Sequence, residues 1–224
     1  MSTDAVPTDR IRVRRIPEKG RYDRAAIDAI LDAGIVAHLG FVHDDQPLVI
    51  PTLHARIGDE LFVHGSSASR TLRVLGEGVP VSVAVTLLDG IVLARSIFEH
   101  SVNYRSVVVL GRARLLDDPA EKLTALEALS EQLLPGRWAD VRPPTEQELK
   151  ATTILALPLD EASAKVSEGP PDDGESPDAQ LDVWAGEIPL VVRPLEPVPD
   201  PLLRPGIPVP PYAVRYDRPG LTTR

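Results

Sequence analysis

Apolar and polar residues alternate over several short stretches in the first two thirds of the chain, which is the pattern of β-strands with one buried face. In the stretch 105–116, Val107, Val109, Gly111, Ala113 and Leu115 fall on one face, and Arg112 and Arg114 fall on the other. The polar turn Asp44-Asp45-Gln46 predicts a hairpin between two such stretches. We expect strands at residues 35–43, 47–55, 60–64, 79–88, 90–96, 105–116 and 152–159.

A helical spacing of apolar residues predicts a few helices between and after these strands. Residues 23–33 carry an apolar stripe, with Asp23 as N-cap and Gly34 as the C-terminal stop. Residues 67–75 predict a second helix, residues 119–134 a third with four leucines on one face, and Thr145 with Glu148 predicts the capping box of a fourth. Six or seven short strands with a few peripheral helices indicate an α+β, mainly β fold built as a small antiparallel barrel.

Composition divides the chain into four segments. Residues 1–21 form a basic arm, which we interpret as solvated, and residues 22–166 form the globular domain. Residues 167–188 are a loop-like extension that contains Trp184, and residues 189–224 are a proline-rich tail. Because proline fixes φ and lacks a backbone donor, the tail is predicted to be extended, either wrapping the domain or a partner or remaining disordered.

Charge and composition exclude several classes of function. The net charge of −9 disfavours nucleic-acid binding, and the absence of cysteine excludes disulfides, thiol nucleophiles and thiolate metal sites. No stretch approaches the roughly 20 apolar residues that span a bilayer, and residues 1–19 lack the apolar core of a signal peptide, so we expect a cytoplasmic protein without membrane association. The five histidines show no metal-ligand spacing, and no metal site is expected.

The stretch Leu61–Thr71 (LFVHGSSASRT) is a candidate phosphate site. Its serines offer hydroxyl donors, Arg70 offers a bidentate guanidinium at a predicted helix start, and Gly65 allows close approach of a ligand to the backbone. A plain N-cap followed by a surface arginine explains the same residues. The Gly-Lys-Ser/Thr signature of a Walker loop is absent.

Two further stretches have a functional and a purely structural interpretation. Glu99–Ser106 (EHSVNYRS) is either a turn whose side chains bond their own backbone or a polar rim for a ligand or a partner subunit. Ile50–His54 (IPTLH) contains a proline within a strand, which places that strand at an edge or beside an opening. Backbone groups there either face a planar ligand or belong to a protected edge.

Taken in order, IPTLH, LFVHGSSASR, HSVNYRSVVVLGRARLL, LTALEALSEQLLPGR and PPTEQELKATTILALPLD resemble the pyridoxamine 5′-phosphate oxidase-related flavin-binding proteins, in the branch of the nitroimidazole-resistance proteins. The resemblance covers roughly residues 14–190, and NYRSVVVLGRARLL is its most specific element. It implies a six-stranded antiparallel split β-barrel that forms a homodimer and binds FMN between its subunits.

The resemblance also implies three groups of cofactor-binding residues and one catalytic residue. By motif match, the resemblance places the flavin ring along Ile50, Pro51, Thr52 and Leu53, and the phosphate at Ser66, Ser69 and Arg70. It implies that Asn103, Tyr104, Arg105 and Ser106 line the cleft and reach the flavin of the other subunit. His64 matches a position near the cofactor and the substrate. A histidine has an ordinary pKa of about 6.5, so His64 is the candidate proton donor.

The expected function is FMN-dependent reduction of a small electron-poor substrate such as a nitroaromatic, with NADH or NADPH as electron donor. Two departures count against vitamin B6 oxidation: Thr71 stands where the oxidases carry a second basic residue, and their C-terminal Arg-x-His signature is missing. A flavin-binding or storage module without turnover is the alternative. A split barrel adapted to haem or a deazaflavin is a third reading, although no pattern nominates an axial haem ligand.

Overall fold

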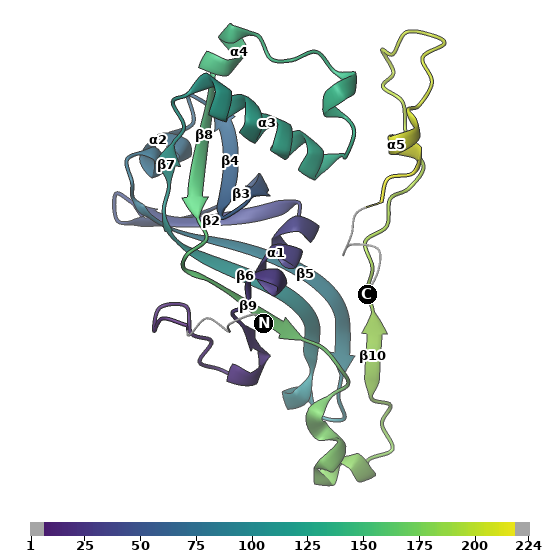
Figure 1. The fold of residues 1–224 in the computed structure, drawn as a ribbon. Coiled ribbons are helices and arrows are strands. Elements are labelled where there is room, and N and C mark those ends of the chain that lie inside the picture. Colours follow the sequence, from purple (N-terminus) through teal and green to yellow (C-terminus); the bar gives the residue numbers. More distant parts are fainter. Residues whose placement is uncertain (1–6, 218–224) are drawn as a thin grey trace.

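The computed structural model describes residues 7–217 and places one antiparallel sheet at the centre of the protein (Figure 1). Its strands pair in the order β1-β9-β6-β5-β2-β3-β4-β8-β7, and β10 pairs with β5 off this path. The strands are β1 (Gly20–Arg21), β2 (Val36–His43), β3 (Gln46–Ile57), β4 (Glu60–Ser66), β5 (Pro80–Leu93), β6 (Ser101–Arg112), β7 (Arg114–Leu115), β8 (Thr152–Pro158), β9 (Ala162–Ser167) and β10 (Gly186–Pro189).

The mainly β, antiparallel α+β class is confirmed, whereas the expected six-stranded barrel is wrong in strand number and in closure. Among the described residues the sheet has ten strands, and its pairing path runs from β1 to β7 without closing. Two of the strands that the sequence did not predict, β1 and β10, have only two and four residues, and the strand predicted at 105–116 is interrupted at Ala113 and divides into β6 and β7. The inward residues of β9 include the alanines Ala162 and Ala164, whose small side chains give a weak hydrophobic signal.

Two strand boundaries also differ from the prediction. The two strands expected at 79–88 and 90–96 form one strand, β5, which continues through a bulge between Leu88 and Gly90. β6 begins at Ser101, so the polar stretch before Arg105 lies in a strand and not in a turn. A bulge of this kind adds local twist without ending a strand, which explains why a glycine in the sequence was mistaken for a break.

The four predicted helices are present with small shifts at their ends, and the described tail, predicted to be extended throughout, contains one short helix, α5, that begins at a proline. Asp23 caps α1 by accepting a hydrogen bond from the amide of Ala26 (2.8 Å), and Thr145 and Glu148 form the expected capping box of α4. Within residues 7–217, no helix combines the length and the apolar character needed to span a membrane. The helices are α1 (Arg24–Ala33), α2 (Arg70–Gly76), α3 (Pro119–Leu133), α4 (Glu146–Lys150) and α5 (Pro211–Val214).

The main core lies between the inner face of the sheet and the helices α1 and α2. Leu31 of α1, Val83 of β5, Val107 of β6 and Leu155 of β8 are almost fully buried in it. A smaller core packs Phe62, Leu116, Ala125, Ile154 and Ala156 around α3, β4 and β8. The core therefore fixes the strands on which the sequence-predicted site residues lie.

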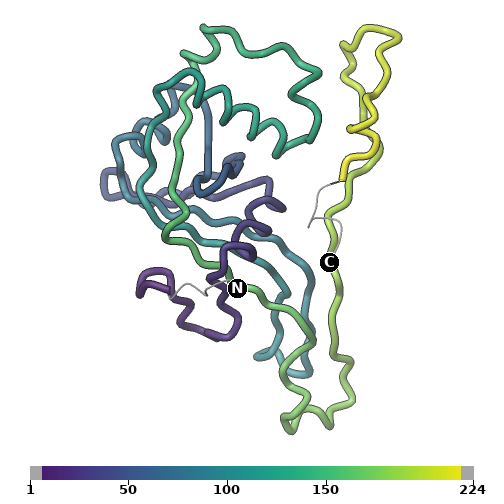
Figure 2. The backbone as a smooth tube through the Cα atoms, in the orientation of Figure 1, coloured from purple at the N-terminus to yellow at the C-terminus, as the bar shows by residue number. Residues whose placement is uncertain are grey.

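The ends of the chain follow different courses. The described part of the N-terminal arm packs along β9, where Lys19 Nζ donates to Ser167 Oγ (3.1 Å) and Lys165 Nζ donates to the carbonyl of Arg15 (3.0 Å), so the arm is not simply solvated. After β10 the chain runs beside the domain as a long extended segment (Figure 2). Residues 1–6 of the arm and 218–224 of the tail lie outside the described residues.

Candidate functional site

β3 changes its pairing partner at the predicted ring-binding residues, and this creates a split in the sheet. Ile50–Leu53 pair only with β2, while β3 pairs with β4 only from His54 to Ile57. Beyond this point β4 continues with β8, up to Ser66. The split is therefore flanked by Ile50–Leu53 on one side and His64–Ser66 on the other, and it brings two of the three predicted groups to one place. Within residues 7–217, the edge of Ile50–Leu53 that faces away from β2 has no strand partner.

The segment between β4 and α2 is rich in hydrogen-bond donors. Ser66 Oγ accepts from the amide of Ala68 (3.1 Å), and Ser69 Oγ accepts from the amide of Leu72 (3.4 Å). Because each hydroxyl acts as acceptor in the loop, its proton remains available for a ligand. Gly65 lies against α2, since an added Cβ would lie 2.9 Å from Leu72 Cδ1. That glycine lets α2 pack on β4.

Arg70 is the charged group of this segment. Its side chain is exposed and makes no hydrogen bond or ion pair with any described residue. The amides of Arg70 and Thr71 also have no acceptor within residues 7–217. The loop thus presents two amides, two hydroxyls and one guanidinium, which is a donor set suited to a phosphate group.

His64 lies at the end of β4, opposite Ile154 of β8 and beside the split. Its ring is half-buried, and its Nδ1 atom is buried without a hydrogen-bond partner among the described residues. Desolvation by this burial lowers the pKa of His64 below its ordinary value. The neutral imidazole is therefore the dominant form at neutral pH, and it holds a lone pair for a proton, a hydrogen bond or a metal.

The third predicted group lies elsewhere in the single chain. Asn103–Ser106 are on β6, which β5 and β2 separate from β3. The Asn103 side chain is buried and donates to the carbonyl of Gly169 (3.0 Å) and to Glu187 Oε2 (2.7 Å). Arg105 forms a bidentate ion pair with Asp89 (2.7 and 2.9 Å). Within one chain Arg105 ties β6 to β5, and Asn103 ties β6 to β10 and to the loop after β9, so these contacts lie away from the split.

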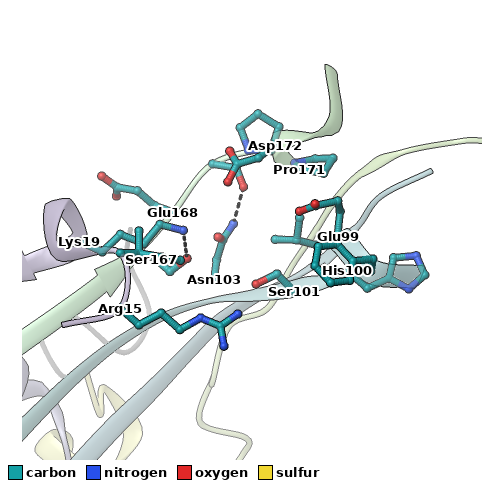
Figure 3. A pocket seen from close by; sticks show the side chains of 15 residues that line it. Arg15, Lys19, Glu99, His100, Ser101, Asn103, Ser167, Glu168, Pro171 and Asp172 are labelled. Atoms are coloured by element: carbon teal, nitrogen blue, oxygen red, sulfur yellow. Dashed lines mark hydrogen bonds between the residues drawn. The ribbon is translucent and has the colours of Figure 1, made fainter. Parts of the chain in front are cut away.

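A polar pocket that the sequence did not reveal lies beside Asn103 (Figure 3). It has a volume of about 200 Å³, and its lining includes Arg15 and Lys19 from the arm, Ser101 from β6 and Asp172 from the loop after β9. The loop that forms one wall is fixed by Asp173, whose buried carboxylate accepts from the amide of Arg95 (2.5 Å) and from its guanidinium (2.7 Å). Asp173 stands in the acidic sequence PPDDGESPD, which reads as a solvated loop, so no local signal marks it.

The outward-facing residues of the sheet are largely apolar. Val36 and Val42 of β2, Val49 of β3, Leu88 of β5 and Val108 of β6 are 37–66% exposed, and cross-strand pairing places them on the same side. We call this set the outer face. His38 lies among these residues and is exposed.

Comparison with known proteins supports this description. The family model described as pyridoxamine 5′-phosphate oxidase matches residues 23–166. The flavocytochrome Anf3 from Azotobacter vinelandii is 40% identical over 95% of this chain and 98% of its own, with a TM-score of 0.89. The FAD and haem binding protein from Mycobacterium smegmatis is 41% identical over 91% of this chain and 97% of its own, with a TM-score of 0.83.

A third structure shares the fold at lower identity. It is the putative 5-nitroimidazole antibiotic resistance protein from Bacteroides thetaiotaomicron, which is 19% identical over 66% of this chain and 86% of its own, with a TM-score of 0.56. No curated protein matches the chain. Because the family model spans more than half of the sequence, from α1 into β9, this protein belongs to the pyridoxamine 5′-phosphate oxidase family.

Proposed function

We propose that this chain is a flavin-dependent redox protein whose flavin binds at the split between β3 and β4. One observation carries the proposal. The strand edge Ile50–Leu53, which has no strand partner among the described residues, and the donor-rich loop Ser66–Arg70 lie on opposite sides of the same split. A flavin offers a planar ring with hydrogen-bonding edges and a phosphate group, and these two features match the two sides. When bound, the flavin supplies the electron-transfer chemistry.

The chain's own residues have separate tasks at this site. The carbonyls of Ile50–Leu53, and the amides of these residues other than Pro51, would orient the ring, and Arg70 with the serine hydroxyls would hold the phosphate. His64 donates or accepts a proton at Nδ1 or Nε2, because burial keeps its imidazole neutral and next to the split. β4 carries two titratable side chains, Glu60 and His64, and of these His64 lies at the end beside the split.

FAD is favoured over the FMN expected from the sequence. The Mycobacterium smegmatis protein, at 41% identity, is named for FAD and haem. Both flavins share the ring and the first phosphate, so the donor set at Ser66–Arg70 serves either one. Chromatographic identification of the released flavin distinguishes them.

Haem is the proposed second cofactor. Both relatives near 40% identity carry it in their names, one as a flavocytochrome and one as a haem-binding protein. An axial imidazole must be neutral and accessible. His64 meets the first condition, but its Nδ1 is buried, without a hydrogen-bond partner among the described residues, and a histidine that binds the iron would not also be the proton donor of the flavin. His38 is exposed on the outer face and meets the second condition. When bound, haem supplies one-electron chemistry to the same protein.

A homodimer accounts for the residues that stand apart in one chain. Asn103–Ser106 lie two strands away from the split, and the outer face is apolar and uncovered. Contiguous apolar residues that stay uncovered on a sheet face mark an association surface. Pairing of two chains through it would bring Asn103–Ser106 of one subunit toward the split of the other.

Reduction of a nitroaromatic by NADH or NADPH remains a prediction, because the nitroimidazole-resistance protein shares 19% identity and therefore only the fold. Storage of flavin without turnover is the competing function. Binding of two redox cofactors, as proposed above, is more typical of electron transfer than of storage.

The test is the absorption spectrum of the purified protein, followed by anaerobic titration with NADH or NADPH. We expect the bands of oxidised flavin together with the intense band of haem, and bleaching of the flavin on reduction. A colourless protein that neither FMN nor FAD reconstitutes would contradict the flavin proposal. Flavin bands without any haem band after haem reconstitution would contradict the second cofactor alone.

A further inference from the structure

The segment of residues 190–210, which we call the strap, is attached to the domain at its first end by strand pairing. β10 pairs with Gly90–Leu93 of β5, and the amide of Leu190 donates to the carbonyl of Asp89 (2.9 Å). Asn103 reinforces this end through its hydrogen bond to Glu187. The strap therefore leaves the domain in a fixed direction.

The second end of the strap is attached through two tyrosines. Tyr212 Oη donates to Asp140 Oδ2 (2.5 Å) and accepts from Arg137 Nη1 (3.0 Å). Tyr216 Oη donates to the carbonyl of Leu133 at the end of α3 (3.0 Å). Figure 1 shows the strap passing from β10 to α5 at the side of the domain. A segment attached at both ends differs from a free tail.

Between these ends the strap exposes large apolar side chains. Leu195 is 79% exposed, and Val198 and Leu202 are each 90% exposed. Residues 191–209 make no hydrogen bond or ion pair with the rest of the described chain. Seven prolines within the strap restrict φ and lower the entropy that is lost when such a segment binds a surface.

The exposed surface of the chain is too large for a compact monomer. It measures 14201 Å², whereas a compact monomer of 24.3 kDa exposes about 10,000 Å². The 13 terminal residues outside the described range account for at most about 2,000 Å² of this difference. Each chain therefore exposes roughly 2,000 Å² more than a compact monomer would. Obligate homodimer interfaces bury about 2,000–5,000 Å² in total, so the surplus from two chains matches one such interface.

The charges of the strap favour a protein surface as its partner. Arg193 and Arg204 balance Glu196 and Asp200, so the strap has no net charge to attract nucleic acid or anionic lipid. The same chain presents the uncovered apolar outer face. Since the strap and the outer face both remain exposed in one chain, the strap does not cover the outer face of its own subunit.

We propose that the strap is an arm that crosses to a second copy of this chain and packs against the part of that copy's outer face that stays uncovered when the two outer faces meet. Two such contacts form around one twofold axis, because each chain supplies one strap and one face. The proposal rests on the homodimer of the proposed function and adds the segment that closes it. The family model ends at residue 166 and does not include the strap.

The first experiment measures the dimer dissociation constant by sedimentation velocity for the full chain and for the double variant Leu195→Asp with Val198→Asp. Burial of each side chain should lower the dimer dissociation constant by a factor of about ten or more. We therefore expect the dissociation constant of the double variant to be at least about 100-fold higher than that of the full chain without substitutions. Leu115→Asp, at an exposed apolar residue on the edge strand β7, away from the strap and its anchors, is the matched control and should leave the constant unchanged. Circular dichroism should show the same folded monomer for all three proteins.

The second experiment locates the contact directly. Since the chain has no cysteine, Val198→Cys gives one attachment site for a photo-cross-linker. In a mixture of isotope-labelled and unlabelled chains, we expect products that join the strap of one chain to β2 or β3 of the other. Products confined to single chains, or an unchanged dimer in the double variant, would overturn the strap proposal and leave the homodimer intact. A wild-type protein that stays monomeric at all concentrations would overturn both, whereas the flavin spectrum reports on the cofactor independently.

Discussion

The domain at residues 23–166 and the strap at residues 190–210 are both rich in apolar residues, yet they place them in opposite environments. In the domain, Leu31, Val107 and Leu155 are at most 1% exposed, whereas Val198 and Leu202 of the strap are 90% exposed. The difference lies in the backbone. Alternating residues in paired strands send every second side chain inward, and prolines in the strap prevent strand or helix formation. Apolar content alone therefore does not identify a core.

The two regions are joined by a small set of buried polar contacts. Asp173 binds Arg95 at the tip of the β5–β6 hairpin, and Asn103 binds Glu187 in β10. These contacts set the direction in which the strap leaves the domain. The comparison predicts large energetic effects for changes in the domain, intermediate effects at the junction, and small effects on the folded monomer for changes in the strap.

The largest expected effect comes from Leu155→Ala in the main core. Loss of a fully buried leucine side chain should lower the free energy of unfolding by about 2–5 kcal/mol. Leu202→Ala, the matched change in the strap, should alter the free energy of unfolding of the dissociated chain by no more than about 0.5 kcal/mol. Urea denaturation at low protein concentration measures both. Equal losses would show that the strap is part of the folding unit.

The next effect is expected at the junction. Asp173→Ala removes a buried carboxylate that binds both the amide and the guanidinium of Arg95, and we expect a loss of about 3 kcal/mol. Hydrogen exchange should become faster at the Arg95 amide, while the amides of β2 and β3 keep their protection. An unchanged rate at Arg95 would contradict the role of this ion pair as an anchor.

Arg70→Ala should weaken flavin binding by about 1.5–3 kcal/mol, because a charge-assisted hydrogen bond to phosphate is lost. Arg73→Ala is the matched control, since Arg73 is also exposed on α2 but lies in its last turn. Fluorescence titration of the apoprotein with FAD and with FMN measures both affinities. Equal affinities for the wild type and both variants would show that the phosphate does not bind at this loop.

The smallest expected effect is a change in pH dependence. Burial lowers the pKa of His64 in the folded chain, so below about pH 6.5 the unfolded chain binds a proton that the folded chain does not. Protonation of His64 therefore does not affect the free energy of unfolding at pH values above the pKa of the unfolded chain. As the pH falls below that pKa, the free energy of unfolding decreases. His64→Gln should therefore flatten the decline of the urea midpoint between about pH 7.5 and pH 5. A variant with the wild-type slope would show that His64 does not cause the decline.

Local signals in the sequence predicted a large part of the domain. The cap of α1 at Asp23, the capping box of α4 and the alternation in β6 each depend on residues a few positions apart. The hairpin turn was predictable for the same reason, and Asp44 and Asp45 adopt positive φ values of 50° and 58°. The proline at position 51 also indicated an edge or opening, and the split lies at that strand.

The sequence by itself determined the mainly antiparallel fold class and the donor-rich loop at Ser66–Arg70, because both follow from short-range spacing. Only the tertiary structure decided the open sheet, the split, and the anchors at Asp173 and Glu187. The partners of Asn103 lie 66 and 84 residues away in the sequence, so no local pattern specifies them. Such contacts form only after the strands have paired, and the free energy of that pairing is shared among residues that the sequence does not mark as neighbours.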